Sequence, residues 1–138
     1  GKSYLAQCIG RHDCEQGDKT LFLNCGQFIE KVKLSKIEGT YIKLLKKLHN
    51  FELLILDDFG LHAFDNQSRQ ALLDIIEDRH DRVSTLVTSQ IPVANWHETI
   101  GEGTIADAIL DRLVYSSHRI ELSGESLRKR KKLKGKAQ

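Results

Sequence analysis

The chain has 138 residues, of which 40% are hydrophobic and 29% are charged. This composition excludes a wholly disordered protein and predicts one soluble domain with its own hydrophobic core. The longest uninterrupted apolar run, at residues 53–56, has only four residues, whereas a membrane-spanning helix needs about 20. We therefore expect no membrane anchor. The three cysteines, an odd number confined to the first fifth of the chain, favour reduced thiols in the cytoplasm over a disulfide framework.

The net charge of +2 conceals an uneven distribution of charge along the sequence. Residues 1–127 hold 14 basic and all 19 acidic residues, a net charge of −5, while residues 128–136 hold the other seven basic residues. An acidic domain with a basic tail is typical of proteins that meet nucleic acid, but it also fits a terminus that only improves solubility. We divide the chain into a domain at 1–127 and a tail at 128–138, in which the candidate DNA contacts are Lys129, Arg130, Lys131 and Lys132.

Hydrophobic patterning predicts helices and strands in alternation. Three of the four expected strands are continuous or nearly continuous apolar runs, as in strands buried on both faces of a parallel sheet. Asp65 and Asn66 offer an N-cap to one helix, and Thr104 with Asp107 forms a start like a capping box for another. The alternation predicts an α/β fold with crossover helices. The expected elements are a helix at 3–10, a strand at 21–24, helices at 26–34 and 38–48, a strand at 53–56, a helix from 66 to about 80, a strand at 85–88, a helix from 104 to about 115 and a strand at 118–122.

The chain opens on Gly1, Lys2 and Ser3, which match the end of the phosphate-binding loop G-x-x-x-x-G-K-[ST]. In such a loop backbone amides hold the phosphates, the lysine reaches the β and γ oxygens, and the serine hydroxyl holds Mg²⁺. Three residues alone are a weak signal, because they also fit the start of a helix. The first glycine of the loop and the four residues after it are missing, and the chain has no methionine, so we expect it to be a fragment.

Two acidic residues, Asp57 and Asp58, directly follow the apolar run at 53–56. A parallel strand would carry them to the carboxyl edge of the sheet, where α/β proteins bind ligands. There Asp57 would complete the Mg²⁺ shell beside Ser3, and Asp58 would polarise or orient the attacking water. Buried strands also end in solvated acids that have no such role, but the Gly-Lys-Ser sequence upstream favours nucleotide binding.

Two further places could carry chemistry. Thr88, Ser89 and Gln90 end the next expected strand, where they could touch a γ-phosphate or its water, or could only satisfy a loop. Arg112 lies on the apolar arc of the helix that begins near Thr104. An arginine there has to reach water, pair with an acid or serve a site, although the dipole at a helix C-terminus also favours a cation.

Four separated motifs are Leu-Asp-Asp-Phe-Gly-Leu at 56–61, Thr-Ser-Gln-Ile-Pro-Val at 88–93, Thr-Ile-Ala-Asp-Ala-Ile-Leu-Asp-Arg-Leu at 104–113 and His-Arg-Ile-Glu-Leu-Ser-Gly-Glu-Ser-Leu-Arg-Lys at 118–129. In this order they closely resemble the IstB-like ATP-binding proteins, helper ATPases of bacterial insertion-sequence transposition. That family is similar to the DnaC helicase loaders and belongs to the AAA+ ATPases. The resemblance therefore implies a P-loop AAA+ core, a parallel sheet flanked by helices with strand order 5-1-4-3-2. Strand 1 and most of the phosphate loop would be missing here, which leaves a gap within the sheet.

The resemblance also implies ligands, partners and residue roles. It implies ATP and Mg²⁺, assembly of ATP-bound subunits on DNA, and recruitment or stimulation of a transposase. A DnaC-like helicase loader and a non-catalytic DNA-binding remnant are the alternatives. Carried over by residue, the resemblance assigns the Walker A loop to Gly1, Lys2 and Ser3, the Walker B acids to Asp57 and Asp58, sensor 1 to Ser89 and Gln90, an arginine finger for a neighbouring subunit to Arg112, and sensor 2 to Arg128.

Overall fold

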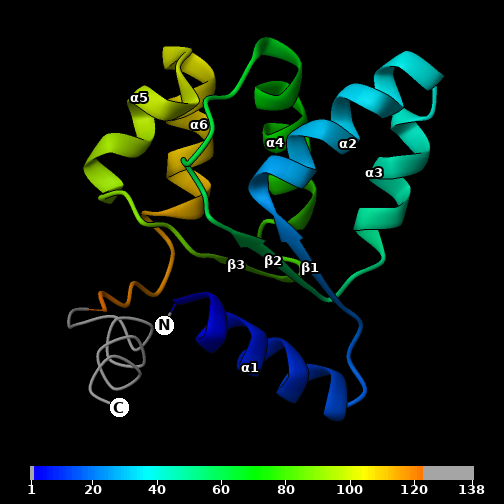
Figure 1. Cartoon of the computed structure of the whole chain (residues 1–138), viewed down its shortest axis with the longest axis vertical. Coiled ribbons are helices and arrows are strands. Elements are labelled where there is room, and N and C mark those ends of the chain that lie inside the picture. Colours follow the sequence, from blue (N-terminus) through cyan, green and yellow to red (C-terminus); the bar gives the residue numbers. More distant parts are fainter. Residues whose placement is uncertain (1, 123–138) are drawn as a thin grey trace, which may run out of the picture.

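A three-stranded parallel sheet forms the centre of the molecule, a computed structural model of which describes residues 2–122 (Figure 1). Its strands are β1 (Thr20–Asn24), β2 (Leu53–Asp57) and β3 (Ser84–Val87), in the order β1-β2-β3. β2 pairs with both neighbours, so that Leu54 lies opposite Leu21 on one side and Thr85 on the other. All five residues of β2 are buried. Its uninterrupted apolar sequence therefore reflects a strand that is covered on both faces.

Helices cover both faces of this sheet (Figure 1). Leu53 and Ile55 of β2 pack with Ala6 on one face, whereas Leu54 and Leu56 enter the larger core on the other face. No helix within residues 2–122 is long and apolar enough to cross a membrane. The first face is covered by α1 (Lys2–Glu15), and the second by α2 (Cys25–Glu38), α3 (Tyr41–His49), α4 (Asn66–Arg79), α5 (Trp96–Ile100), which follows a 3₁₀ turn at Val93–Asn95, and α6 (Gly103–Leu113).

Side chains and one glycine determine where α2 and α4 begin and end. Asn24 Oδ1 accepts a 2.9 Å hydrogen bond from the amide of Gly26 at the start of α2. The helix ends at Gly39, whose φ of 71° suits a residue without a side chain. At the start of α4, Asp65 accepts a 2.8 Å hydrogen bond from the Ser68 amide, and the Asp65 amide donates to the Ser68 hydroxyl at 3.0 Å. This capping box confirms the predicted N-cap at residue 65.

The start of α6 differs from the expectation. The sequence pattern predicted a capping box between Thr104 and Asp107, but the helix begins one residue earlier and its cap is Glu102. The Glu102 carboxylate accepts hydrogen bonds from the amides of Thr104 and Ile105, at 3.2 and 2.7 Å. These two amides are unpaired donors of the first turn, and a carboxylate satisfies both of them at once.

Residues 118–122 form no strand, so that this expectation is wrong. Within residues 2–122, the edge of β3 opposite β2 pairs with no other strand. A cavity of about 520 Å³ is lined by that edge of the sheet, by α1 and by residues 118–122. Residues 118–122 make no backbone hydrogen bonds with this free edge and lie across the cavity from it, so the segment is irregular and Ile120 is 75% exposed. The order β1-β2-β3 is compatible with strands 2, 3 and 4 of the expected order 5-1-4-3-2.

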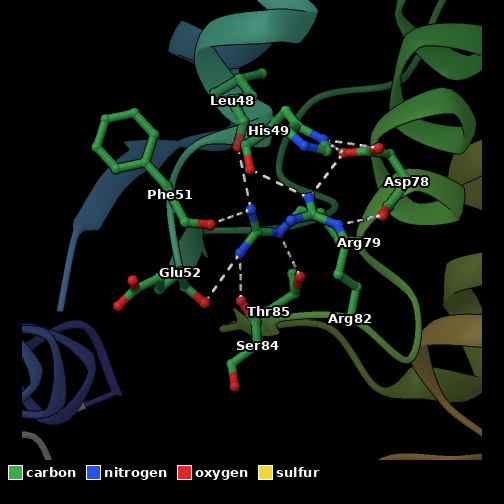
Figure 2. Close-up of polar contacts among 9 residues, drawn as sticks. All are labelled: Leu48, His49, Phe51, Glu52, Asp78, Arg79, Arg82, Ser84 and Thr85. Carbon is green, nitrogen blue, oxygen red and sulfur yellow. Dashed lines mark hydrogen bonds and ion pairs between the residues drawn. The ribbon is translucent and has the colours of Figure 1, made fainter.

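A buried arginine links the backbone segments at the amino end of the sheet (Figure 2). Arg79, the last residue of α4, is 1% exposed. Burial lowers the pKa of its guanidinium to about 10, so that it remains charged at neutral pH. The guanidinium ties α4 to the chain that enters β2 and to the start of β3. It donates hydrogen bonds to the carbonyls of Leu48 at 3.1 Å, Phe51 at 2.7 Å, Glu52 at 3.4 Å and Ser84 at 2.6 Å, and to the hydroxyl of Thr85 at 3.0 Å.

Candidate functional site

The carboxyl end of the sheet brings Ser3, Asp57 and Thr88 together. Asp57 ends β2 and is 6% exposed. Its carboxylate accepts hydrogen bonds from the Ser3 hydroxyl, at 2.9 and 3.0 Å to the two oxygens, and from the Thr88 hydroxyl. Ser3 lies in the first turn of α1. A helix N-terminus therefore starts directly beside a buried carboxylate that is 54 residues away in the sequence.

Lys2 reaches the same edge of the sheet from the first residue of α1. Its ammonium donates a 2.7 Å hydrogen bond to the backbone carbonyl of Ser89. The Ser89 hydroxyl itself donates to the Phe59 carbonyl at 2.5 Å and accepts from the Ile91 amide at 3.2 Å. The side chain of Ser89 thus supports the loop that follows β2, and its contact with Lys2 runs through the backbone.

Asp58 has a backbone conformation that separates it from Asp57. Its φ is 56°, in the left-handed region that Asp and Asn tolerate better than other residues with side chains. The Asp58 carboxylate accepts a 3.3 Å hydrogen bond from the side-chain amide of Asn24 and a 3.5 Å hydrogen bond from that of Gln90. Two adjacent acids therefore have different partners, and the carboxylate of Asp58 is held by two amides from neighbouring strand ends.

Asn24 is a site residue that the sequence analysis missed, because it was considered only as the end of a strand. It lies opposite Asp57 in the pairing of β1 with β2. One side chain performs two tasks, since Oδ1 caps α2 and Nδ2 donates to Asp58. A signal was present in the sequence: parallel strands end at the same edge of a sheet, so the polar end of 21–24 had to lie near the acids after 53–56.

Arg112 contacts a different part of the molecule. Its Nη1 donates a 2.8 Å hydrogen bond to the carbonyl of Ala108, and its Nη2 lies 3.3 Å from a carboxylate oxygen of Glu77 on α4. The side chain of Arg112 is 32% exposed. Neither contact involves a residue around Asp57. Within one subunit, Arg112 is therefore not part of the cluster of Ser3, Asp57 and Thr88.

Several predicted site residues lie outside the described part of the chain. Their roles in binding ATP or DNA stay predictions, as does the boundary between a domain at 1–127 and a tail at 128–138. These residues are Gly1, Arg128, Lys129, Arg130, Lys131 and Lys132.

The donor atoms around Asp57 fit a hard divalent cation that is bound together with a phosphate. Hydroxyl and carboxylate oxygens suit Mg²⁺, which takes one or two carboxylates, water and phosphate oxygens rather than a closed protein cage. Residues 2–122 contain no group of three or more His, Cys, Asp and Glu side chains arranged to hold a metal. The first turn of α1 adds backbone amides and the positive end of a helix dipole.

The sequence matches the family described as IstB-like ATP binding protein over residues 1–135. It is 47% identical over 134 residues to the insertion sequence ATP-binding protein y4pL of Sinorhizobium fredii, a match that covers 97% of this chain and 55% of the relative. It is 30% identical over 134 residues to the insertion sequence IS21 ATP-binding protein of Pseudomonas aeruginosa, with 97% and 51% covered. The chain thus spans about half the length of these relatives.

Solved structures share the fold. The crystal structure of the DnaC helicase loader has a TM-score of 0.65 at 22% identity, over 81% of this chain and 68% of that chain. AMPPCP-bound DnaA from Aquifex aeolicus has a TM-score of 0.66 at 14% identity, over 80% of this chain and 35% of that chain. The parallel sheet and its helices thus have the same fold as the matching parts of these two proteins. By its match over nearly all of its length, the chain belongs to the IstB-like ATP-binding proteins.

Proposed function

We propose that the full-length protein binds ATP with Mg²⁺ and hydrolyses it in the cytoplasm as a helper of DNA transposition. One observation carries the ATP part of this proposal: the Ser3 hydroxyl, at the N-terminus of α1, lies against the buried carboxylate of Asp57. A phosphate-binding loop places a helix N-terminus and a hydroxyl beside a carboxylate in this way to bind phosphate and Mg²⁺. The transposition part is supported by the relatives, which are described as insertion sequence ATP-binding proteins.

Lys2, Ser3 and Asp57 bind the phosphates and the cation in this proposal. Lys2 now donates to the neutral carbonyl of Ser89, and a β or γ oxygen of ATP replaces this acceptor with a charged one, which makes a stronger hydrogen bond. Gly1 and the first amides of α1 contact the phosphates, and Ser3 and Asp57 hold Mg²⁺. The cation neutralises charge that develops on the phosphate oxygens during hydrolysis.

Asp58 acts on the attacking water. The amides of Asn24 and Gln90 bind its two carboxylate oxygens, one each. This arrangement leaves lone pairs free to accept a hydrogen from a water molecule and fixes the plane of the carboxylate. Ser89 and Gln90 stand beside the γ-phosphate as sensor 1, and Arg128 serves as sensor 2.

Arg112 serves the site of a neighbouring copy, and the basic tail serves DNA. The side chain of Arg112 is partly exposed and, within residues 2–122, makes no contact with the cluster around Asp57; both observations support contact with a phosphate held by another subunit. ATP-bound subunits then assemble on DNA and recruit or stimulate a transposase. The tail residues that contact DNA phosphates are Lys129, Arg130, Lys131 and Lys132.

The second candidate is a helicase loader. It is favoured by the likeness to the DnaC helicase loader, which this chain covers to 68%. Both candidates use the same ATP chemistry and differ in the protein partner. Stimulation of strand transfer by a purified transposase supports the first candidate, whereas loading of a replicative helicase on single-stranded DNA supports the second.

The ATP site is tested in the full-length protein by two variants with different expected losses. Lys2→Ala should abolish ATP binding, because Lys2 contacts the phosphates in the ground state. Asp58→Asn should preserve binding and slow hydrolysis, because Asp58 acts on water. Nucleotide titration and phosphate release measure the two quantities, and Lys47→Ala, at an exposed position of α3, is the control for a lost positive charge.

Two outcomes would contradict the proposal. Equal loss of ATP binding in Lys2→Ala and Asp58→Asn refutes the division of roles between the two residues. A wild-type protein that binds DNA but no ATP refutes the ATPase and favours a non-catalytic DNA-binding protein.

A further inference from the structure

Three arginines on helices differ in how completely the protein uses their N–H groups. Each guanidinium carries five N–H donors. Arg79 donates five hydrogen bonds, and Arg69, which is 9% exposed, donates three, to the carbonyls of Phe64 and Ile100 and to a side chain. Within residues 2–122, Arg112 donates only one hydrogen bond and is 32% exposed. Arg112 therefore retains donors for an anion from outside its own subunit.

Glu77 lies at the position from which it can orient this guanidinium. Its carboxylate is 3.3 Å from Nη2 of Arg112, while the other terminal nitrogen donates to Ala108. Glu77 belongs to the last turn of α4, two residues before Arg79, which anchors that helix to the base of the sheet. The carboxylate thus stands on a well-anchored helix and meets a long side chain that is otherwise free to adopt many rotamers.

We propose that Glu77 is a positioning residue, which holds Arg112 in the orientation in which it meets a phosphate bound by a neighbouring copy of this chain. The inference rests on the trans role of Arg112 given under Proposed function. A partly exposed ion pair is weak, and this one engages only Nη2 of Arg112. Glu77 therefore reduces the rotamer freedom that Arg112 would lose on assembly, without competing for the donors that contact the phosphate.

The first test compares two neighbouring residues of α4 in the full-length protein. Glu77→Gln preserves the size of the side chain and removes its charge, and it should lower ATP-dependent hydrolysis and assembly by about twofold to fivefold. ATP affinity of the isolated subunit should not change, and Glu77→Asp should restore part of the activity. The control is Asp78→Asn, which weakens exposed pairs with His49 and Arg82 but leaves the contact between Glu77 and Arg112, and it should assemble and hydrolyse ATP as wild type does.

The second test separates positioning in trans from a general effect on stability. Subunits with Lys2→Ala hold no ATP but carry an intact pair of Glu77 and Arg112. When they are mixed with Glu77→Gln subunits, each Lys2→Ala subunit can present a correctly positioned Arg112 to ATP bound by a Glu77→Gln neighbour. Mixing should therefore restore hydrolysis by the Glu77→Gln subunits. In an Arg112→Ala background, Glu77→Gln should lower activity no further, because the side chain that it positions is gone.

The outcomes distinguish this inference from the proposal on which it rests. If Arg112→Ala assembles and hydrolyses ATP as wild type does, the trans role is refuted, and the role of Glu77 with it. If Arg112→Ala is inactive while Glu77→Gln is as active as wild type, only the role of Glu77 is refuted. A loss in Glu77→Gln that persists in the Arg112→Ala background, or that mixing does not restore, also overturns it.

Discussion

The two ends of the same parallel strands carry opposite kinds of polar cluster. At the amino end, Arg79 is buried and its five donors are bound mainly to backbone carbonyls (Figure 2). At the carboxyl end, side chains hold the carboxylates of Asp57 and Asp58, among them Ser3 and Asn24. The carbonyls that bind Arg79 are fixed in the backbone at the end of α3, before β2 and at the start of β3, whereas a side-chain hydroxyl or amide can rotate to a new partner. The contacts at the amino end therefore fix the backbone, whereas those at the carboxyl end can rearrange.

Chain direction explains this difference. In the crossover connections, α2 begins where β1 ends, and α4 ends before β3 begins. Helix N-termini, with free amides and a positive dipole end, thus gather at the carboxyl end of the sheet, and helix C-termini with free carbonyls gather at the amino end. A phosphate fits the first environment, and the guanidinium of Arg79 fits the second.

The largest effect on stability is expected at the amino end. Arg79→Met should lower the free energy of unfolding by about 3–5 kcal/mol, because it leaves buried carbonyls without their charged donor. Chemical denaturation of the full-length protein measures this loss, and Arg82→Met, at an exposed position, should cost less than about 1 kcal/mol. If the Arg79→Met protein is as stable as wild type, the hydrogen bonds at the amino end do not stabilise the fold as proposed.

A change at the carboxyl end should instead affect the ligand. Asp57→Asn should weaken Mg²⁺-dependent ATP binding by about tenfold or more, because the side chain loses the charge that faces the cation. Titration with and without Mg²⁺ measures the effect, and without the cation the two proteins should differ little. If Mg²⁺ strengthens ATP binding equally in both, Asp57 has no part in holding the ion.

Asn24 offers a smaller and more specific change at the same end. Asn24→Ser retains a good N-cap for α2 but is too short to donate to Asp58. Loss of one hydrogen bond, about 1 kcal/mol, should lower kcat for ATP hydrolysis about fivefold with KM unchanged. Steady-state kinetics measure this effect. A fall in stability with kcat intact would show instead that Asn24 serves only the helix.

Ionisation of the Cys25 thiol should lower the free energy of unfolding in alkali but not at neutral pH. Burial, reinforced by the negative charge of Asp58, raises the pKa of this thiol from 9.0 to about 11. The folded protein then holds the thiol proton more tightly than the unfolded chain. This contribution to stability is complete below pH 9 and is lost as the pH rises through 11.

The measurement is the free energy of unfolding between pH 8 and 11. It should fall more steeply in wild type than in Cys25→Ala, since the substitution removes this titration. In the native protein at pH 8, the exposed Cys8 and Cys14 should react with iodoacetamide while Cys25 does not. Equal slopes in the two proteins would show that the carboxyl end is more open to water around Cys25 than its burial indicates.

Local patterns in the sequence determined much of the fold. The continuous apolar run at 53–56 predicts a strand buried on both faces, and the structure confirms it as β2. The polar residues at 65 and 66 predict the start of α4, because a cap is a contact between residues three positions apart. The same reasoning failed at 118–122, because strand character in one segment does not supply the neighbouring strand to which it must bond.

Only the tertiary structure decided which side chains meet across elements. Asn24 holds Asp58, and Glu77 pairs with Arg112, through contacts between residues 34 and 35 positions apart. Whether such residues touch depends on the register between two strands or on how two helices are rotated against each other. The packing of the whole core sets both, and no periodicity in a single segment contains that information. The sequence alone therefore determined the elements and the ends at which polar residues gather, while the fold determined their partners.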